Sequence, residues 1–597
     1  MDGFWQRLRQ RKLVQWSVAY IAAAFAFVQV LDVVAQRFGW PDRLEKLIIL
    51  ALVLGFFVVL VLAWYHGERG AQRVGGTEFT IIVLLLLVGG GALWVYARAP
   101  AKSPIAVVTA DHPVSPVPVA KPSGAPAAMT EKIPAESVAV LPFANESGRP
   151  DERYFSDGLS EDLINALSQF AGLKVISRNS AFQFRDSRDS SAQIGQLLGV
   201  AHLLEGSVQR AGDEVRITAT LVNASDGSTL WSRQYDKPYK DLFALQDAIT
   251  AAVAGALKAK LLTTNGAVLQ SDRPPSGNLA AYTAYQHGVA YAALGTEADF
   301  HRANDAFNAA IRLDPKYAAA YARLSMTWIG LAATGAAKSQ EAIANSGQAS
   351  ATALHLDPGS ALAHLARALW FGALDMQWSS AAAQAQRALQ LAPGDAMAQF
   401  VMGNTAAMLG QNQRSIRLTR QALVSDPRHA AWYRWLSVYL TARGQLDAAR
   451  DAADTAVALQ PGAAFNHAQL AVIEIVRGDA KGALAAAKQE PPGVWRNIAV
   501  TQALQIGADR AAANAALHDL VSHDAPDAPF QIAEVYALRR DPDAMFQWLD
   551  RAWAAHDAGI GYLLFDPFIL RYRADPRFAA FCKKVGLPAT TDAVAMK

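Results

Sequence analysis

The stretch ALQLAP at residues 388–393 recurs as ALVSDP at 422–427 and as AVALQP at 456–461. Each copy carries apolar residues into a proline, and the three prolines follow one another at intervals of 34 residues. Two looser copies upstream, AIRLDP at 310–315 and ATALHLDP at 351–358, extend the series with proline intervals of 43 and 35 residues. Because proline cannot continue a helix, the copies mark the regular ends of helices in a repeated unit.

A 34-residue period of paired helices is the signature of the tetratricopeptide repeat. Small or apolar residues occupy the positions at which the two helices of such a repeat meet: Phe307, Met402, Gly403, Ala422, Leu436, Ser437, Ala449, Ala456, Leu470, Ala471, Gly478 and Ala483. We therefore expect five or six repeats over residues 280–490, followed by degenerate helical repeats and a C-terminal cap over 491–597, in a right-handed solenoid.

A solenoid of this kind has a concave groove, which the first helix of each pair lines and in which a peptide or helix can bind. By the register of the motif, Trp370, Phe400, Asn404, Arg434 and Val438 are the candidate peptide-groove residues. The alternative is that Trp370 and Phe400 fill space between helices. A clamp for two carboxylates needs a set of Lys, Asn and Arg, and only Asn404 fits it, so we do not expect that ligand.

The segment before the repeats, residues 137–262, predicts an α+β domain in the order β-α-β-α-β-β-β-α. The stretch EVRITATLVN at 214–223 alternates apolar and polar residues, as half-buried antiparallel strands do. Gly212-Asp213 and Asp226-Gly227 supply the hairpin turns on either side of it.

The stretch RYFSDGLSEDL at 153–163 contains enough polar groups to suggest a catalytic loop. No histidine, cysteine or lysine lies nearby to activate a nucleophile, so we interpret it as a helix start. We expect Asp157 or Ser160 to cap the helix, Gly158 to form the turn before it, and Glu161 with Asp162 to lie in its first turn.

Three separated motifs in this segment resemble the TolB amino-terminal-like domain: SVAVLPFANESGRPDERYFSDGLSEDLINALSQFAGLKVISRNSAF, LLGVAHLLEGSVQRAGDEVRITATLVNASDGSTLWSRQYD and DLFALQDAIT. The resemblance covers residues 137–262 and implies a non-catalytic module of bacterial proteins, often followed by tetratricopeptide repeats. In other relatives the module follows a nucleotide-cyclase or winged-helix output domain. This chain has apolar segments in that place.

The first 98 residues predict a membrane domain with three transmembrane helices, at about 13–35, 47–64 and 80–96. Two spans are the fallback, because the first run contains polar residues, and a cleaved signal peptide is disfavoured because two more runs follow. Lys and Arg are slightly more frequent on the N-terminal side, which places the N-terminus inside. We therefore expect a bacterial inner-membrane protein whose residues after 98 are periplasmic, with residues 99–136 as a Pro/Ala-rich linker.

Composition disfavours several functions. The formal charge of +3 over 597 residues, without a dense basic stripe, argues against nucleic-acid binding. Cys582 is the only cysteine, and neither H-E-x-x-H nor a P-loop motif occurs. We therefore expect no enzyme activity, no catalytic, cofactor-binding or metal-binding residues, no cofactor and no small-molecule substrate.

The whole pattern predicts a multi-domain protein: N-terminal transmembrane helices, an α+β TolB-N-like domain and an all-α tetratricopeptide-repeat solenoid. The favoured hypothesis is a membrane-anchored interaction scaffold that binds protein partners through the groove and the TolB-N-like module. The alternative is a transmembrane signal-transducing sensor or regulator, related to the cyclase- or winged-helix-linked proteins but without their output domain.

Overall fold

The computed structural model describes residues 133–149, 152–257, 260–261, 272–333 and 339–594, all within one unit that spans residues 122–597. The three expected membrane spans and nearly all of the linker lie outside these residues. None of the helices that the structure describes is long and apolar enough to cross a bilayer.

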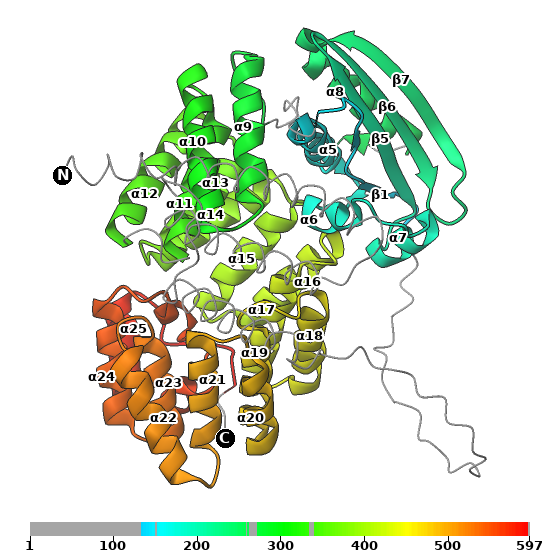
Figure 1. The fold of residues 1–597 in the computed structure, drawn as a ribbon. Helices are drawn as coiled ribbons and strands as arrows, with labels where there is room; N and C mark the ends of the chain where they lie inside the picture. The colour runs from blue at the N-terminus through cyan, green and yellow to red at the C-terminus, as the bar shows by residue number, and fades with distance from the viewer. Residues whose placement is uncertain (1–132, 150–151, 258–259, 262–271, 334–338, 595–597) are drawn as a thin grey trace, which may run out of the picture. The chain divides into compact units, whose positions relative to one another are not determined.

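A mixed sheet forms the first part of the described chain (Figure 1). Its strands are β1 (Ser137–Val140), β2 (Ala144–Asn145), β4 (Lys174–Val175), β5 (His202–Ala211), β6 (Glu214–Asn223) and β7 (Thr229–Pro238). The order is β4-β1-β5-β6-β7, and β2 also pairs with β5. Strand β1 is parallel to β4 and β5, whereas β5, β6 and β7 are antiparallel. Strands β3 (Phe170–Ala171) and β8 (Lys260–Leu261) form a separate antiparallel pair.

The predicted hairpins are present. Gly212 lies in the two-residue turn between β5 and β6, and Gly227 lies in the connection from β6 to β7. Both have a positive φ, 62° and 70°, which glycine adopts without strain. Between them Val215 and Ile217 point into the core while Arg216 is exposed, so the predicted alternation is confirmed.

Helices cover both faces of the sheet. Helices α5 (Arg153–Leu167) and α8 (Leu242–Ala256) pack on the face that carries Val138 and Val140 of β1. Helix α6 (Arg178–Ala181), the 3-10 turn η2 (Phe182–Phe184) and helix α7 (Ser191–Leu198) pack on the opposite face, which carries Ala139. The domain is therefore the expected α+β sandwich.

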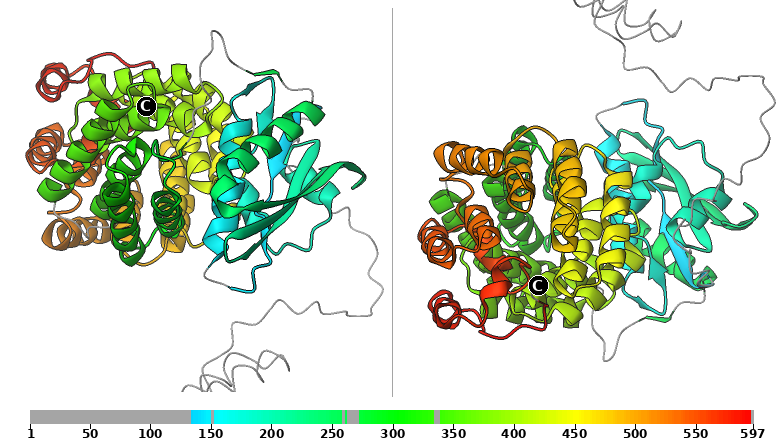
Figure 2. Two further views of the ribbon diagram at one scale, coloured as in Figure 1. Left: turned by 90° about the horizontal axis from the view of Figure 1, so that it is seen from above. Right: turned by 90° about the horizontal axis from the view of Figure 1, so that it is seen from below.

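The rest of the chain is helical and consists of consecutive helix pairs (Figure 2). The pairs are α9 (Leu279–Ala292) with α10 (Glu297–Leu313), α11 (Ala318–Ala333) with α12 (Ser339–Leu356), α13 (Ala361–Ala373) with α14 (Trp378–Leu391), α15 (Ala396–Met408) with α16 (Asn412–Ser425), α17 (Ala430–Ala442) with α18 (Leu446–Leu459), α19 (Asn466–Arg477) with α20 (Ala480–Gln489), α21 (Val494–Gln505) with α22 (Arg510–His523) and α23 (Pro529–Arg539) with α24 (Pro542–Ala554). The 3-10 turns η4 (Ala558–Tyr562) and η5 (Ile569–Tyr572) and helix α25 (Pro576–Val585) follow.

The sequence pattern explains these pairs. Helices α10, α12, α14, α16 and α18 each end two residues before the proline of their repeat copy, as predicted. Phe307 of α10 is fully buried, and a Cβ on Gly288 of α9 would lie 2.5 Å from its ring. Ser437, Ala449 and Ala456 are also fully buried where α17 and α18 meet. Small residues thus set the close spacing within each pair, which gives a tetratricopeptide-like solenoid.

The stretch RYFSDGLSEDL opens helix α5, so the helix is present, but the expected placements of its cap, its turn and its first-turn acids are wrong. Helix α5 begins at Arg153, and no side chain caps it. Asp157 is inside the helix and pairs with Arg185 at 2.6 Å, and Ser160 Oγ accepts a hydrogen bond from the Phe143 amide at 3.0 Å. These polar groups have tertiary partners, and the capping interpretation considered only local ones.

Candidate partner-binding surface

Helix α5 joins the sheet domain to the first helices of the solenoid through charged groups. The Glu161 carboxylate forms ion pairs with Arg178 of α6 at 3.1 Å and with Arg323 of α11 at 3.3 Å. Gly158 lies so close to α9 that a Cβ would be 2.5 Å from the Gln286 side chain. This face of α5 is therefore a fitted contact between the two parts.

Asp162 lies in the same contact and accepts hydrogen bonds from the Tyr282 hydroxyl and, at 2.7 Å, from the Gln246 amide. Burial raises the pKa of Asp162 to about 7, although the hydrogen bond from Tyr282 opposes the shift; the charges of Asp272 and Glu161 add to it. The carboxyl therefore titrates near neutral pH.

A second junction joins α6 to the turn between α16 and α17. The Ser177 amide donates to the Ser425 carbonyl at 2.7 Å. Asp426 accepts hydrogen bonds from the Ser180 hydroxyl and, at 3.2 Å, from the Asn179 amide, and burial raises its pKa to about 6. The sheet domain is thus attached to the first, the second and the fourth helix pairs.

Trp370, the first predicted groove residue, lies on α13 against α12. Its indole N–H donates to the Ile343 carbonyl at 2.8 Å, and the Arg367 guanidinium lies 4.1 Å from the centre of its ring. A Cβ on Gly347 would lie 2.8 Å from the indole. The indole therefore takes part in packing between helices.

Phe400 and Asn404 lie on α15 and face α17. The Phe400 ring stacks on Trp432 with a centroid distance of 4.9 Å, and the Asn404 amide donates to the Tyr439 hydroxyl at 2.8 Å. Both side chains therefore connect successive first helices.

Arg434 and Val438 lie on α17, farther along the same line of first helices. Arg434 donates to the Ala464 carbonyl at 3.2 Å, and its guanidinium lies 5.1 Å from the centre of the Phe465 ring. Val438 lines a pocket, described below. All five predicted residues are on first helices, as expected, but they do not meet at one site.

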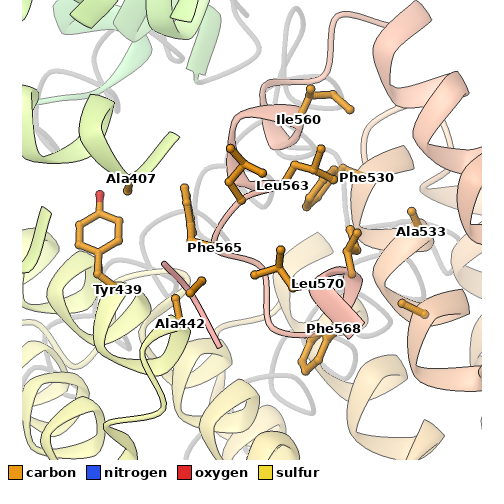
Figure 3. Packing of buried hydrophobic residues seen from close by; sticks show 14 of the residues in the cluster. Ala407, Tyr439, Ala442, Phe530, Ala533, Ile560, Leu563, Phe565, Phe568 and Leu570 are labelled. Atoms are coloured by element: carbon orange, nitrogen blue, oxygen red, sulfur yellow. The ribbon is translucent and has the colours of Figure 1, made fainter. Parts of the chain in front are cut away.

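The C-terminal segment covers part of this concave line. Figure 3 shows Phe565 beside Tyr439 of α17 and Leu563 beside Phe530 of α23. The rings of Tyr439 and Phe565 meet edge to face at 5.7 Å, and those of Trp435 and Tyr562 do so at 5.4 Å. The loop after α24 therefore builds one wall of the concave surface.

The end of the chain also returns to the middle repeats. The Asp592 carboxylate accepts hydrogen bonds from the amides of Asn412 at 2.7 Å and Gln413 at 3.0 Å, and so caps α16. The Trp378 indole donates to the Val585 carbonyl at 3.0 Å. The motif register gives no sign of this return.

The pocket beside Val438 is a cavity of about 70 Å³. Its walls come from α17, α19, α21, α23 and the loop after η4: Trp435, Val438, Thr441, Phe465, Ala468, Gln469, Val472, Trp495, Ile498, Gln502, Gln531, Glu534, Tyr562, Phe565, Asp566, Pro567 and Phe568. Its lining is thus largely aromatic, with two acids and three amides.

The two acids of the pocket form a pair. Asp566 accepts hydrogen bonds from the amides of Phe568 at 3.0 Å and Ile569 at 2.7 Å, and the Gln502 amide donates to Glu534 at 2.6 Å. Burial and the neighbouring Asp566 charge raise the pKa of Glu534 well above its usual range. This shift favours a protonated Glu534 carboxyl that donates a hydrogen bond to the Asp566 carboxylate, which leaves one negative charge on the pair.

The pocket acids were missed in the sequence because the register loosens beyond residue 490. A signal existed: Glu534 lies between the apolar residues Phe530, Ala533 and Ala537 on the buried side of a helix. In the described ranges no group of three or more His, Cys, Asp or Glu residues could hold a metal ion.

The family comparison matches the sheet domain. Residues 134–252 match the family described as HilA/YgeH-like transcriptional regulator, second domain. A stretch of 131 residues is 44% identical to a Rhizobium meliloti (strain 1021) protein named putative adenylate cyclase 3. The stretch is 22% of this chain and 22% of that protein, so the chain spans about a fifth of the length of this relative.

The solved structures that resemble the helical region include PilF of Pseudomonas aeruginosa, the tetratricopeptide-repeat protein YrrB and yeast Tom70. PilF is 15% identical with a TM-score of 0.29, covering 35% of this chain and 90% of that one. YrrB is 18% identical with a TM-score of 0.25, covering 36% and 98%. Tom70 is 13% identical with a TM-score of 0.31, covering 54% and 69%. TM-scores this low do not define the class of the protein. The helix pairs define it as a helical-repeat protein with a mixed-sheet module.

Proposed function

We propose that this protein is a non-enzymatic scaffold that binds a partner polypeptide along the concave side of its helical repeats. The observation that carries this is the line of partly buried aromatic and polar side chains on successive first helices, ending at the pocket beside Val438. Helical-repeat surfaces of this kind bind extended peptides or helices. The two junctions with the sheet domain hold the stack in one arrangement for that purpose.

The scaffold is proposed to be anchored in the bacterial inner membrane by residues 1–98, with the repeats in the periplasm. The apolar runs of the sequence support this part of the proposal. Alkaline phosphatase and a cytoplasm-only fluorescent protein, each fused after Lys597, test it. Phosphatase activity without fluorescence is expected, and fluorescence alone would contradict the periplasmic placement.

Site-specific photocrosslinking in cells tests the binding surface. A photoreactive amino acid replaces Arg434 or Val438 on the concave line, or Arg417 or Asp451 on exposed positions of second helices as matched controls. We expect one partner polypeptide to crosslink from the first two positions and not from the controls. Equal crosslinking from both sets, or none from the concave positions, would refute the proposal.

The second candidate is a transmembrane sensor or regulator. The similarity of residues 134–252 to a domain of transcriptional regulators, and of a 131-residue stretch to part of a protein named as a cyclase, supports this candidate. In that case the concave partner acts as a signal, and deletion of the chain changes transcription or cyclic-nucleotide levels. If transcription and cyclic-nucleotide levels are both unchanged in a deletion strain, the sensor hypothesis is rejected and the scaffold proposal stands.

A further inference from the structure

The pocket beside Val438 has a negative charge that no cation offsets within the described residues. None of the ion pairs found there includes Glu534 or Asp566. Asp557, in the turn before η4, adds a further acid nearby. A buried acidic pair of this kind is costly to maintain without a partner cation.

An amide in the pocket also lacks a partner. Gln531 is 7% exposed and lines the cavity, and its side chain forms no hydrogen bond with any described residue. Its amide atoms are not among the fully buried ones that lack a partner, so they are open to the cavity and can hydrogen-bond a polar group there. Its carbonyl oxygen provides an acceptor beside the two acids.

The walls of the pocket suit a cation with an apolar stem. Trp435, Phe465, Trp495 and Tyr562 provide aromatic surfaces, which attract cations through their ring faces. Phe465 has a left-handed backbone with a φ of 74°, which is strained for a bulky residue. The buried Glu490 carboxylate accepts from the Phe465 amide and holds this conformation, with the ring 4.6 Å from Trp495.

We infer that this pocket binds one basic side chain, a lysine or an arginine, of the partner polypeptide. The inference deepens the proposed function and rests on it. The ammonium or guanidinium group donates to Glu534, Asp566 and Gln531, and the methylene stem lies between the aromatic rings. A cavity of about 70 Å³ holds the end of one side chain, whereas small-molecule sites have several hundred Å³.

Binding of the cation releases the Glu534 proton to water, so that both carboxylates accept hydrogen bonds from the cation. The groups that face this carboxyl are Asp566, Asp557, the Tyr562 hydroxyl and the Gln502 amide, and none of them is cationic. Arg434 is the nearest base of α17, and its bond to the Ala464 carbonyl holds it at the Phe465 side of the pocket. Affinity for a basic side chain is therefore expected to rise with pH as Glu534 ionises.

The test uses the full-length protein in detergent micelles and three capped amino acids: N-acetyl-lysine methylamide, N-acetyl-arginine methylamide and the uncharged N-acetyl-norleucine methylamide. Binding is followed by isothermal titration calorimetry, because the chain has 14 tryptophans and its fluorescence does not isolate those of the pocket. We expect saturable binding of the two basic probes, at least about tenfold tighter than norleucine, which corresponds to one charge-assisted contact. Equal binding of all three, or none by the basic probes, would overturn the inference.

Glu534→Gln removes the charge without disturbing the fold, because glutamine has nearly the shape of protonated glutamate. This variant is expected to keep its melting temperature and to bind the basic probes about tenfold more weakly. The exposed Asp451→Asn on α18 is the matched control and should bind as the unmodified protein does. If the partner still crosslinks but neither basic probe binds, this inference is rejected and the proposed scaffold function stands.

Discussion

At the residue scale, the contact between the sheet domain and the repeats includes a carboxyl group that titrates near neutral pH. Asp162 is held between Tyr282 and Gln246, and both donate to it. Its neighbours Glu161 and Asp272 are acidic, so burial and repulsion act in the same direction on its proton. The contact is therefore most favourable when Asp162 is neutral.

The contribution of Asp162 to the stability of the protein should fall as the pH rises from about 4 to about 7. Folding raises the pKa of Asp162 from an ordinary value near 4 to about 7. The bound proton therefore contributes its full stabilisation below about pH 4, and this contribution is lost as the pH rises to about 7. Asp162→Asn keeps the acceptor oxygen and removes the charge, and should raise stability at pH 8 by roughly 2–4 kcal/mol. Denaturant unfolding at pH 5 and pH 8 measures this.

Asp305→Asn, at an exposed position of α10, is the control for that experiment. It should leave the pH dependence unchanged. If Asp162→Asn shows the same slope between pH 5 and pH 8 as the unmodified protein, then Asp162 does not carry the extra proton.

Gly288→Ala tests the close spacing in the first helix pair. The added Cβ would lie 2.5 Å from the ring of Phe307, which is fully buried and cannot move away. Overpacking of this kind should cost about 1–3 kcal/mol. Gly255→Ala on α8 has no atom within 4 Å of its Cβ and should be neutral or stabilising by roughly 0.5–1 kcal/mol. Thermal unfolding of the two variants should therefore shift in opposite directions, and equal shifts would contradict the packing.

At the scale of elements, the helix ends were predictable and their long-range partners were not. Proline fixes where a helix stops, whatever surrounds it, so five helices end as the sequence indicates. The polar groups of α5 depend on α6, α9 and α11, which lie far away in the sequence. The pocket acids could not be predicted, because the repeat motif is degenerate in the last helix pairs and gives no register there.

The segment after α25 is expected to stabilise α16, which it caps from 180 residues away. Asp592→Ala removes both acceptors for the amides of Asn412 and Gln413, and should cost about 1 kcal/mol. The loss should also free the Val594 amide, which donates to the Ala442 carbonyl at 2.7 Å.

Hydrogen exchange checks this element, because peptides covering 408–416 and 588–594 should lose protection together in Asp592→Ala. Asp509→Ala serves as a control, since Asp509 caps its own helix α22 through the Ala512 amide at 2.9 Å. This control should increase exchange at α22 alone. Loss of protection at 588–594 without any change at 408–416 would show that the cap is not coupled to α16.

At the scale of the whole described chain, the two junctions should make the sheet domain and the repeats unfold together. Arg323 bridges them, with Glu161 at 3.3 Å and Asp272 at 3.9 Å. Arg323→Ala leaves Asp272 without this cation and Glu161 with Arg178 alone, and should cost about 1–3 kcal/mol because the pair is only partly buried.

Differential scanning calorimetry should show a shared transition in the unmodified protein and a separate, earlier transition of the sheet domain in Arg323→Ala. Arg312→Ala, on an exposed position of α10, should keep the shared transition because it removes a charge without touching the junction. Two transitions already present in the unmodified protein would mean that the domains are independent. In that case the sheet domain would not hold the first, second and fourth helix pairs in register, and the C-terminal segment would have to fix the concave surface.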